Sequence, residues 1–488
     1  RKELSDLTYH RSPPLVSRQL RIGLKERLDE RGDILIPMSE EELPEIVDRL
    51  KKSGVESVAV CFLHAYANPS HEEKVSKAIR DAGFFVSASS RVLPEYREYE
   101  RASTTCVNAY VSPLMIRYLH ELNQKLGHGS LRIMQSNGGV ISGETAAREA
   151  VRTILSGPAG GVVGGFQVAN AAGFRNVITF DMGGTSTDVS LIDETIGFTG
   201  ETEVAGCPIR IPVIDIHTVG AGGGSIARCD PGGALEVGPE SAGADPGPIC
   251  YGRGTEVTVT DANLFLGRLD PDRFLGGRMR LQKQSVKKGI ENLAASLNLS
   301  RIQTAEGVLQ VADQHMARAI RLISVERGHD PREYVLVSFG GAGAMHACSL
   351  ARILDIPAVL IPRDPGILSA RGMVVADVVR DYAQTVLLPA EAANSAKLDH
   401  YFRPLLDRAK NELRKEGFSS IRAEQFADMR YFGQSFEITV SIPKGGNLSG
   451  KLLSRFHEMH DSRFGISNPQ RPVEVVTLRV RAVGKVKK

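Results

Sequence analysis

The sequence has 488 residues, of which 42% are hydrophobic and 24% charged, an ordinary composition for a folded protein of two or three domains. Its 60 basic and 57 acidic side chains give a net charge of +3, a balance that offers no electrostatic attraction for nucleic acid or a membrane surface. No apolar run approaches the length that spans a bilayer, and the N-terminus lacks a signal-peptide pattern. We therefore expect a cytoplasmic protein with no nucleic-acid and no membrane partner.

Cysteine usage indicates the redox compartment of the protein, and glycine usage indicates where its loops pack closely. The six cysteines show no C-x-x-C spacing, which predicts free thiols in a reducing compartment. Many of the 49 glycines cluster between positions 156 and 254. Because glycine loses the most conformational entropy on folding, such a cluster indicates loops where the backbone must approach a neighbour or a ligand closely.

The first 150 residues alternate between strand and helix patterns, which predicts an α/β layer architecture. Gly54 and Gly83 mark helix ends, and Pro113 is expected to kink or split the long third helix. The predicted strands are 34–36, 58–62 and 131–134, and the predicted helices are 40–53, 68–81 and 99–126.

The remaining chain divides into a central region and a C-terminal one. A helix of small residues is expected over about 158–172, where short side chains permit close packing. We expect glycine- and proline-rich loops over 217–254, and Asp261 is expected to cap a helix. The other predicted elements are helices within 283–327, a strand over 334–339, a helix over 344–354, and two helices with strands such as 436–440 and 475–483 within 390–488. The predicted domains are 1–150, 151–385 and 386–488.

The most informative segment is a predicted hairpin. Apolar runs at 177–180 and 189–192 flank the pair Gly183-Gly184, where the backbone can approach a ligand and its N–H groups can form an anion-binding nest. Asp181 and Asp188 bracket the turn with carboxylates, the hard oxygen ligands that hold Mg²⁺ against phosphates. Hydroxyl donors are added by Thr185, Ser186 and Thr187. An ordinary hairpin with polar tips is the alternative.

Two further glycine loops are candidates for contact with phosphate or a nucleoside. One contains Gly222, Gly223 and Gly224, but Ser225 replaces the third glycine of a dinucleotide fingerprint, so we exclude a Rossmann site. His217 before this loop is an acid–base candidate, or a structural histidine. The second loop lies between a predicted strand and helix, which suits phosphate binding at a helix N-terminus or is simply a close turn. It contains Gly340, Gly341 and Gly343.

The helical spacing of His457 and His460 suits a metal, but two histidines without a third ligand are more often a solvated or interface face.

Taken together, these motifs resemble the ATP-dependent hydantoinase A and 5-oxoprolinase family, which includes N-methylhydantoinase A and the β subunit of acetone carboxylase. The hairpin also resembles the phosphate hairpin of the actin, sugar kinase and Hsp70 fold. The chain reads Ala344-Met345 where the family usually has Pro-Leu, a departure that affects helix entry. The matching segments, in the family's order, are MQSNGG (134–139), SGPAGG (156–161), DMGGTSTD (181–188), HTVGAGGGS (217–225), SAGADPGP (241–248), TDAN (260–263), FGGAG (339–343) and YFGQSF (431–436).

The resemblance implies a fold and an activity. The expected fold class is α/β, an actin-like ATPase clamp of two related halves with a C-terminal α+β module. The implied activity is ATP-dependent hydrolysis of a cyclic amide, with ATP and Mg²⁺ as cofactors and a hydantoinase B type subunit as partner in a hetero-oligomer. A ketone carboxylase subunit and a truncated, non-catalytic scaffold subunit are the alternatives.

One departure from the family pattern affects the hydrolase, carboxylase and scaffold interpretations alike. The family has a hairpin of the Asp-x-Gly-Gly-Thr type in each half of the clamp, whereas this chain has a single copy, at 181. We expect the chain to be truncated at both ends or degenerate, and catalysis to require the missing N-terminal segment and a partner.

Overall fold

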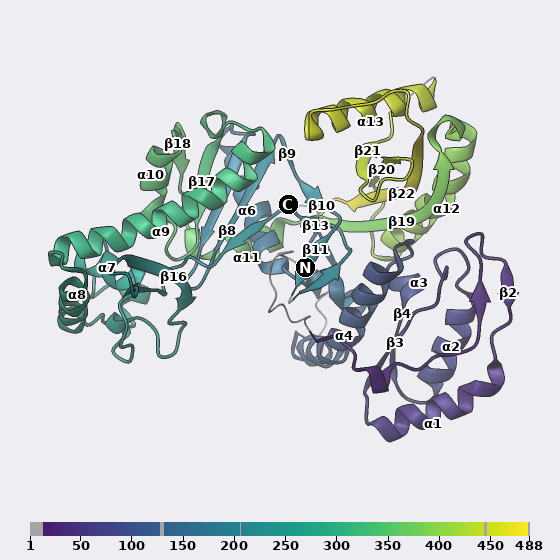
Figure 1. Cartoon of the computed structure of the whole chain (residues 1–488), viewed down its shortest axis with the longest axis horizontal. Coiled ribbons are helices and arrows are strands. Elements are labelled where there is room, and N and C mark those ends of the chain that lie inside the picture. Colours follow the sequence, from purple (N-terminus) through teal and green to yellow (C-terminus); the bar gives the residue numbers. More distant parts are fainter. Residues whose placement is uncertain (1–12, 127–130, 205, 444–446, 487–488) are drawn as a thin grey trace. The chain divides into compact units, whose positions relative to one another are not determined.

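A computed structural model describes residues 13–126, 131–204, 206–443 and 447–486 (Figure 1). The chain forms two compact units, which are described separately. Unit 2 consists of Leu155–Phe198 and Ile214–Ala376, and unit 1 consists of Arg1–Ile154, Thr199–Val213 and Asp377–Lys488. The short strands β10 (Phe198–Thr199) and β13 (Val213–Ile214) contain the residues at which the chain passes from one unit to the other.

Unit 2 is a sheet covered by helices. Its helices are α6 (Ser156–Ala171), α7 (Val259–Phe265), α8 (Lys283–Leu297), α9 (Arg301–Ile323), α10 (Ala344–Ile353) and α11 (Leu368–Val375). Its strands are β7 (Val177–Met182), β8 (Thr187–Asp193), β9 (Thr195–Ile196), β14 (His217–Val219), β15 (Ser225–Cys229), β16 (Leu235–Ser241), β17 (Val335–Phe339) and β18 (Ala358–Leu360).

The sheet of unit 2 has the order β14-β8-β7-β17-β18, with β9 also paired to β8. On one side of β7 the neighbours are antiparallel, and on the other side β17 and β18 are parallel. An antiparallel meander extended by parallel strands is the arrangement expected of one half of an actin-like ATPase, so the α/β expectation is confirmed. The predicted hairpin of 177–180 with 189–192 is confirmed as well, since β7 pairs with β8 in this sheet.

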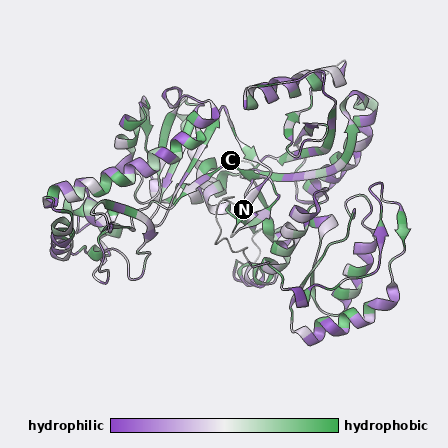
Figure 2. Cartoon of the chain, viewed as in Figure 1, coloured by the Kyte–Doolittle hydropathy of each residue, from purple (hydrophilic) through white to green (hydrophobic). Residues whose placement is uncertain are grey.

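The two faces of this sheet differ in what covers them. Ile178, Phe180 and Val189 point into a core shared with α7 to α10, and all three are fully buried. The other face lies against α6. The close contact is seen at Gly165 of α6, where a Cβ would stand 3.1 Å from Cγ2 of Thr179 on β7. The helix α9 shows the amphipathic pattern of a covering helix (Figure 2), and a reciprocal capping box between Ser300 and Gln303 fixes its start.

The helix of small residues packs as expected. Along α6, Gly160 and Gly164 let α11 approach so closely that a Cβ at either would stand 2.8 or 2.7 Å from a backbone carbonyl oxygen of α11. Gly372 meets them from the other side, with only 1.9 Å between a Cβ there and Gly160 O. Larger side chains at these positions would separate the two helices.

Unit 1 contains a long mixed sheet and several smaller elements. Its helices are α1 (Leu43–Ser53), α2 (Ser70–Asp81), α3 (Ser89–Val92), α4 (Glu98–Leu126), α5 (Gly143–Arg148), α12 (Ser395–Lys415) and α13 (Leu448–Phe464). Its strands are β1 (Arg27–Leu28), β2 (Ile34–Ile36), β3 (Ser57–Val60), β4 (Phe85–Ala88), β5 (Arg132–Met134), β6 (Val140–Ser142), β11 (Thr202–Val204), β12 (Cys207–Ile209), β19 (Val378–Pro389), β20 (Ile421–Tyr431), β21 (Ile438–Ser441) and β22 (Val473–Gly484).

The expected boundary at 386 requires a correction. It falls inside β19, and the six-stranded sheet β21-β20-β22-β19-β6-β5 joins C-terminal strands to strands from before residue 150. The MQSNGG segment makes this junction: Gln135 Nε2 donates to Val379 O at 3.0 Å, and Asn137 Nδ2 donates to Asp381 Oδ2 at 2.6 Å. Residues 386–488 therefore share a sheet with the N-terminal region and are not a module of their own.

A buried ion network further ties three chain segments of unit 1 together. Arg479 binds both carboxylate oxygens of Glu95 at 2.8 Å and Asp428 Oδ2 at 2.6 Å. Arg210 reaches Glu95 at 3.1 Å and Glu437 at 2.5 Å. Glu95, Arg210 and Asp428 are buried, and the side chain of Arg479 is 18% exposed, so the enclosed charges depend on their partners for compensation.

Other expectations differ in detail. The region 217–254, expected to be loops, contains β14, β15 and β16, because short strands separated by glycine resemble loops in sequence. Pro113 lies inside the single helix α4 rather than splitting it, and β20 was not anticipated. Asp261 does help to cap α7, as expected, but as the third residue of the helix: its carboxylate accepts from the N–H of Thr258 in a capping box whose N-cap is Thr258.

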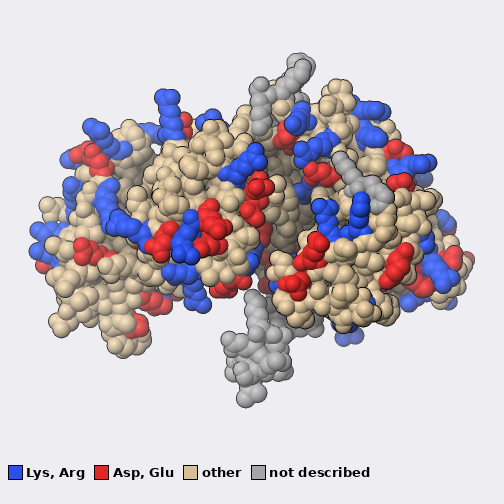
Figure 3. All heavy atoms as spheres, turned by 90° about the horizontal axis from the view of Figure 1, so that it is seen from above, with Lys and Arg blue, Asp and Glu red and all other residues tan. Residues whose placement is uncertain are grey.

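The surface shows no single-signed field on the face in Figure 3, where basic and acidic side chains are interspersed. Among the described helices, none is both long and apolar enough to cross a membrane.

Candidate functional site

The predicted hairpin is present, and it ends in a tight turn. Asp181 on β7 faces Asp188 on β8 in the register of the two strands, and Met182 faces Thr187. Gly183 N donates to Ser186 O at 3.0 Å, which closes the turn over residues 183–186. The two carboxylates therefore lie side by side at the base of the turn, on one face of the sheet.

The carboxylate of Asp181 is confined by residues from two other segments. A Cβ at Gly340 would stand 2.4 Å from Asp181 Oδ1, so the loop after β17 runs directly over the carboxylate. Ser369 Oγ, on α11, donates to Asp181 Oδ2 at 3.3 Å. Gly340 therefore lies directly beside the hairpin.

Both carboxylates are poorly solvated and have no cationic neighbour. Burial, together with the charge of Asp188, raises the pKa of Asp181 to about 6, and the bond from Ser369 offsets part of this rise. Burial also raises the pKa of Asp188, against a hydrogen bond from Thr218 Oγ1 at 2.5 Å. Within the described residues, no lysine or arginine forms an ion pair with either group. A bound cation would relieve this unfavourable pairing.

The turn presents backbone donors. The carbonyl oxygens of Gly183 and Gly184 are occupied, because Gly223 N donates to the first at 3.0 Å and Gly224 N to the second at 2.6 Å. By contrast, the N–H groups of residues 184–186 have no acceptor in the described part of the chain. Gly184 and Thr185 are exposed. Adjacent amides without an acceptor, on exposed residues, are what an anion-binding turn requires.

The triple-glycine loop has a different place from the expected one. Gly222 N donates to Ser225 Oγ at 2.8 Å, so the amides of all three glycines have internal partners. A Cβ at Gly222 would stand 2.7 Å from Thr185 C, which explains why glycine is needed there. The loop therefore supports the turn from behind, an arrangement that argues against direct phosphate contact by its amides. Thr187 is likewise buried, and its hydroxyl donates to Ala221 O at 2.6 Å.

The loop after β17 leads into α10 beside the hairpin. Gly340 adopts φ +81°, a left-handed conformation that favours glycine, and its N–H donates to Pro365 O at 3.1 Å. Ala342 N donates to Met182 O at 3.0 Å, which fixes the loop to the end of β7. Nothing lies within 4 Å of a Cβ at Gly341, whereas Gly343, the N-cap of α10, is closely packed against Phe339 O.

His217 does not join this site. It pairs with Val189 in the β14–β8 ladder, and successive side chains of a strand point to opposite faces. Its neighbour Thr218 shares the face of the carboxylates, so His217 lies on the opposite, core-facing side. The sequence could not show this, because the register of the third strand was not predicted.

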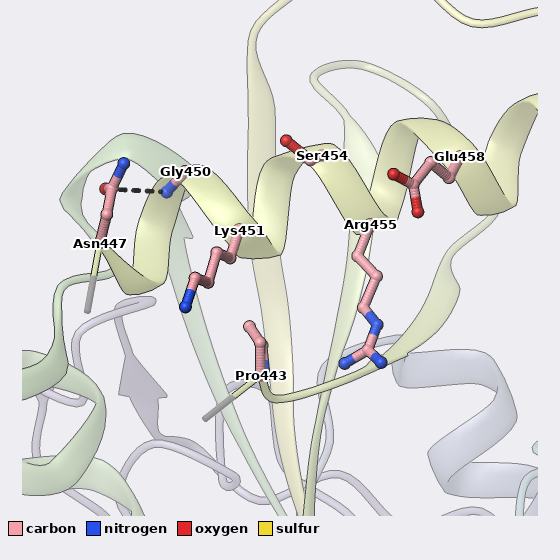
Figure 4. A pocket seen from close by; sticks show the side chains of 7 residues that line it. All are labelled: Pro443, Asn447, Gly450, Lys451, Ser454, Arg455 and Glu458. Carbon is pink, nitrogen blue, oxygen red and sulfur yellow. Dashed lines mark hydrogen bonds between the residues drawn. The ribbon is translucent and has the colours of Figure 1, made fainter. Parts of the chain in front are cut away.

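The histidine pair on α13 has structural partners. His457 Nδ1 lies 2.9 Å from Tyr431 Oη, and His460 Nδ1 lies 2.6 Å from Ile466 O. No group of three or more His, Cys, Asp or Glu with metal-binding geometry occurs in the described residues. A hollow of about 630 Å³ lies on the same helix, away from the hairpin in the sequence and in the other unit (Figure 4). Its lining residues are Pro443, Asn447, Gly450, Lys451, Ser454, Arg455 and Glu458.

Sequence reasoning missed the supporting residues of the site. Ser369 is 188 positions from Asp181, and no motif marks it. Asp261 was expected only as a helix cap, yet its carboxylate accepts from the N–H groups of Ile249, Cys250 and Thr258 and organises the loop before α7.

The donor set of the hairpin fits Mg²⁺. Two carboxylates and nearby hydroxyls are hard oxygen donors, and Mg²⁺ is commonly held by one or two carboxylates plus substrate phosphates. The absence of a compensating cation beside Asp181 and Asp188, within the described residues, agrees with this fit.

Comparisons with known proteins place the chain in a family. A family model described as Hydantoinase/oxoprolinase matches residues 101–382, and a model of its N-terminal region matches residues 1–83. The chain is 37% identical to caprolactamase subunit alpha of Pseudomonas jessenii, covering 99% of this chain and 72% of that subunit. It is 37% identical to 5-oxoprolinase of Saccharomyces cerevisiae, covering 91% of this chain and 36% of that protein.

Solved structures agree. The ATP-dependent caprolactamase from Pseudomonas jessenii superposes with a TM-score of 0.89 at 37% identity, over 99% of this chain and 72% of that one. Nucleotide-free acetone carboxylase superposes with a TM-score of 0.74 at 27% identity, over 98% and 71%. On these matches, the chain belongs to the hydantoinase/oxoprolinase family.

Proposed function

We propose that this chain is the nucleotide-binding subunit of an ATP-dependent cyclic-amide hydrolase. Relatives in the family are an ATP-dependent caprolactamase and 5-oxoprolinases, whose names describe cyclic amides as substrates. The observation that carries the proposal is the half-buried pair Asp181 and Asp188 beneath a turn with unpartnered amides, within the described residues.

The site residues divide by their chemistry. Asp181 and Asp188 would hold Mg²⁺, which supplies charge neutralisation for the phosphates when bound. The amides of residues 184–186 and the hydroxyls of Thr185 and Ser186 would bind phosphate oxygens. The loop with Gly340, Gly341 and Gly343, at the head of α10, would line the nucleotide, and of these three glycines Gly341 leaves open space where a Cβ would stand.

ATP is needed because an amide carbonyl is a poor electrophile. The ring carbonyl oxygen would attack the γ-phosphorus of ATP as the bond to the β-phosphate oxygen breaks, giving ADP and an O-phosphorylated ring. Water would then add to the carbon, and the ring C–N bond would open with protonation of the nitrogen, leaving an acyl phosphate. A second water would hydrolyse the acyl phosphate to the carboxylate and inorganic phosphate. The protein contributes positioning and electrostatic stabilisation of the transferring group.

A second subunit would complete the enzyme. The caprolactamase relative is a named subunit, so a hetero-oligomer is expected here, and a hydantoinase B type subunit is the proposed partner. We propose a cytoplasmic location for the complex, which the lack of disulfide bonds among the described residues supports.

The test is ATP turnover by the purified protein with and without its partner. Lactam-stimulated release of phosphate supports the hydrolase. Stimulation by bicarbonate with a ketone, and not by a lactam, would favour the carboxylase alternative, which the likeness to acetone carboxylase keeps in view. No nucleotide binding under any condition would leave the scaffold alternative.

A further inference from the structure

A buried titratable group lies beneath the loop of residues 340–343 after β17, which we call the nucleotide loop. This group has no part in the chemistry above. His346 is the third residue of α10 and is fully buried. Its Nδ1 lies 2.6 Å from Oδ1 of Asp313 on α9, and its Nε2 lies 3.3 Å from Nδ2 of Asn263 on α7. Both partners are nearly or wholly enclosed.

The contacts of this cluster fit one tautomer of His346. A carboxylate can only accept, so Nδ1 of His346 donates to Asp313, and Nε2 is then left to accept from the amide of Asn263. The second N–H of that amide donates to Val259 O at 3.1 Å. The imidazole therefore links three helices, and each of its ring nitrogens has a defined role.

Each of the linked helices also supports the hairpin or its neighbouring loops. On α7, Thr260 donates to Gly223 O through both its N–H and its hydroxyl at 2.7 Å, and Gly223 N in turn donates to Gly183 O. On α9, the sulfur of Met316 lies 3.5 Å from the hydroxyl of Thr187. On α10, the N-cap Gly343 belongs to the loop that runs over Asp181.

We propose that His346, held between Asp313 and Asn263, is a positioning residue that keeps the nucleotide loop and the phosphate hairpin in register. It touches no substrate, and it acts by fixing α10 against α7 and α9. The inference rests on the proposed function, since it assumes that the hairpin and the loop after β17 bind nucleotide.

The experiment compares two buried histidine–carboxylate contacts of the same kind. His71 on α2 contacts Glu26 at 2.8 Å in unit 1, with side chains 5% and 6% exposed, against 0% and 5% for His346 and Asp313. The variants are H346N and, as the matched control, H71N, with D313N as a second test should H346N fail to fold. Thermal unfolding and Mg-ADP affinity by calorimetry are measured on each folded variant. KM and kcat for ATP are measured on the same variants in a full-length context with the partner subunit.

Both histidine variants are expected to lower the unfolding temperature. Only H346N and D313N are expected to weaken Mg-ADP binding tenfold or more and to raise KM for ATP with kcat within twofold of wild type. Wild-type Mg-ADP affinity in H346N and D313N, or an equal loss of affinity in H71N, would overturn this inference and leave the proposed function standing. If the wild-type protein itself binds no Mg-ADP, the proposed function fails, and the inference falls with it.

Discussion

Gly340 and Asp181 are separated by 159 positions in the chain, yet no room for a side chain remains between them. A Cβ at position 340 would stand 2.4 Å from Oδ1 of Asp181 and 2.4 Å from the carbonyl oxygen of Met182. The parallel pairing of β17 with β7, in which Phe339 faces Asp181, brings the two together. The strand order of unit 2 thus creates the candidate site, because it places the end of β17 beside the phosphate hairpin.

Replacement of Gly340 by alanine should therefore damage both fold and site. The added methyl meets a carboxylate oxygen and a backbone oxygen, and φ at this position is +81°, so we expect a loss of about 1–3 kcal/mol of unfolding free energy. Urea denaturation measures the loss. Gly341→Ala is the control, since nothing lies within 4 Å of its Cβ. Equal stability of the two variants would contradict the close approach.

The variant Gly184→Ala tests ligand binding by the turn without disturbing the packing of the protein. No atom lies within 4 Å of a Cβ at Gly184, and its φ is not positive, so stability should stay within about 0.5 kcal/mol of wild type. If phosphate binds the turn amides, however, the methyl should weaken Mg-ADP binding measurably by calorimetry.

The variant Gly223→Ala, by contrast, should disturb the packing of the protein. Its Cβ would stand 2.8 Å from Thr260 Oγ1, within the support behind the turn, so this variant should lose stability as well as affinity. Unchanged nucleotide affinity in a folded Gly184→Ala protein would show that the turn does not contact phosphate.

These glycines also show how far sequence could predict the site. The hairpin with Asp181 and Asp188 was recognisable because carboxylates, glycines and hydroxyls adjoin in the chain. Which glycines face a ligand and which pack against protein could not be recognised from the sequence. That distinction depends on contacts between segments that are distant in the chain. Gly223 supports the hairpin only because Thr260, 37 positions later, fixes it.

The fold shows the same limit. The helices α8 and α9 lie within the predicted helical region 283–327, and α1 and α2 were predicted near their true positions. The short strands β14 to β16 were not, since they contain too few side chains for a period to appear. The sheet that joins β19 to β6 depends on long-range pairing, through contacts such as that of Asn137 with Asp381, which local patterns do not encode.

The buried ion network of unit 1 predicts an asymmetric response to charge removal. Glu95→Gln leaves Arg479 and Arg210 enclosed without their shared carboxylate, so we expect a loss of about 3–5 kcal/mol in unfolding free energy. The control is Glu40→Gln, whose partner Lys74 lies at 2.6 Å on an exposed surface and whose loss should be undetectable. Comparable losses in the two variants would mean that the network contributes nothing beyond surface pairing.

In a full-length context with its partner, Asp181→Asn should abolish ATP hydrolysis while leaving the protein folded, because the amide cannot serve as an anionic ligand beside Asp188. Loss of such an electrostatic group should cost several kcal/mol of transition-state stabilisation, of the order of 3–4 kcal/mol. Phosphate release from the folded variant at the wild-type rate would remove the hairpin from the active site.

The same variant should also change how stability depends on pH, measured without metal or nucleotide. In the folded state the pKa of Asp181 is raised to about 6 from an unfolded value of 3.8, so the folded protein holds a proton that the unfolded chain has released. Wild-type stability should therefore fall as pH rises through the window from 3.8 to 6, and asparagine removes this fall. Between pH 5 and pH 7.5, wild type should lose about 1 kcal/mol relative to Asp181→Asn in urea unfolding. Added Mg²⁺ should reduce the difference, because a cation favours the ionised carboxylate. A stability difference that does not vary with pH would show that Asp181 ionises in the fold as it does in water.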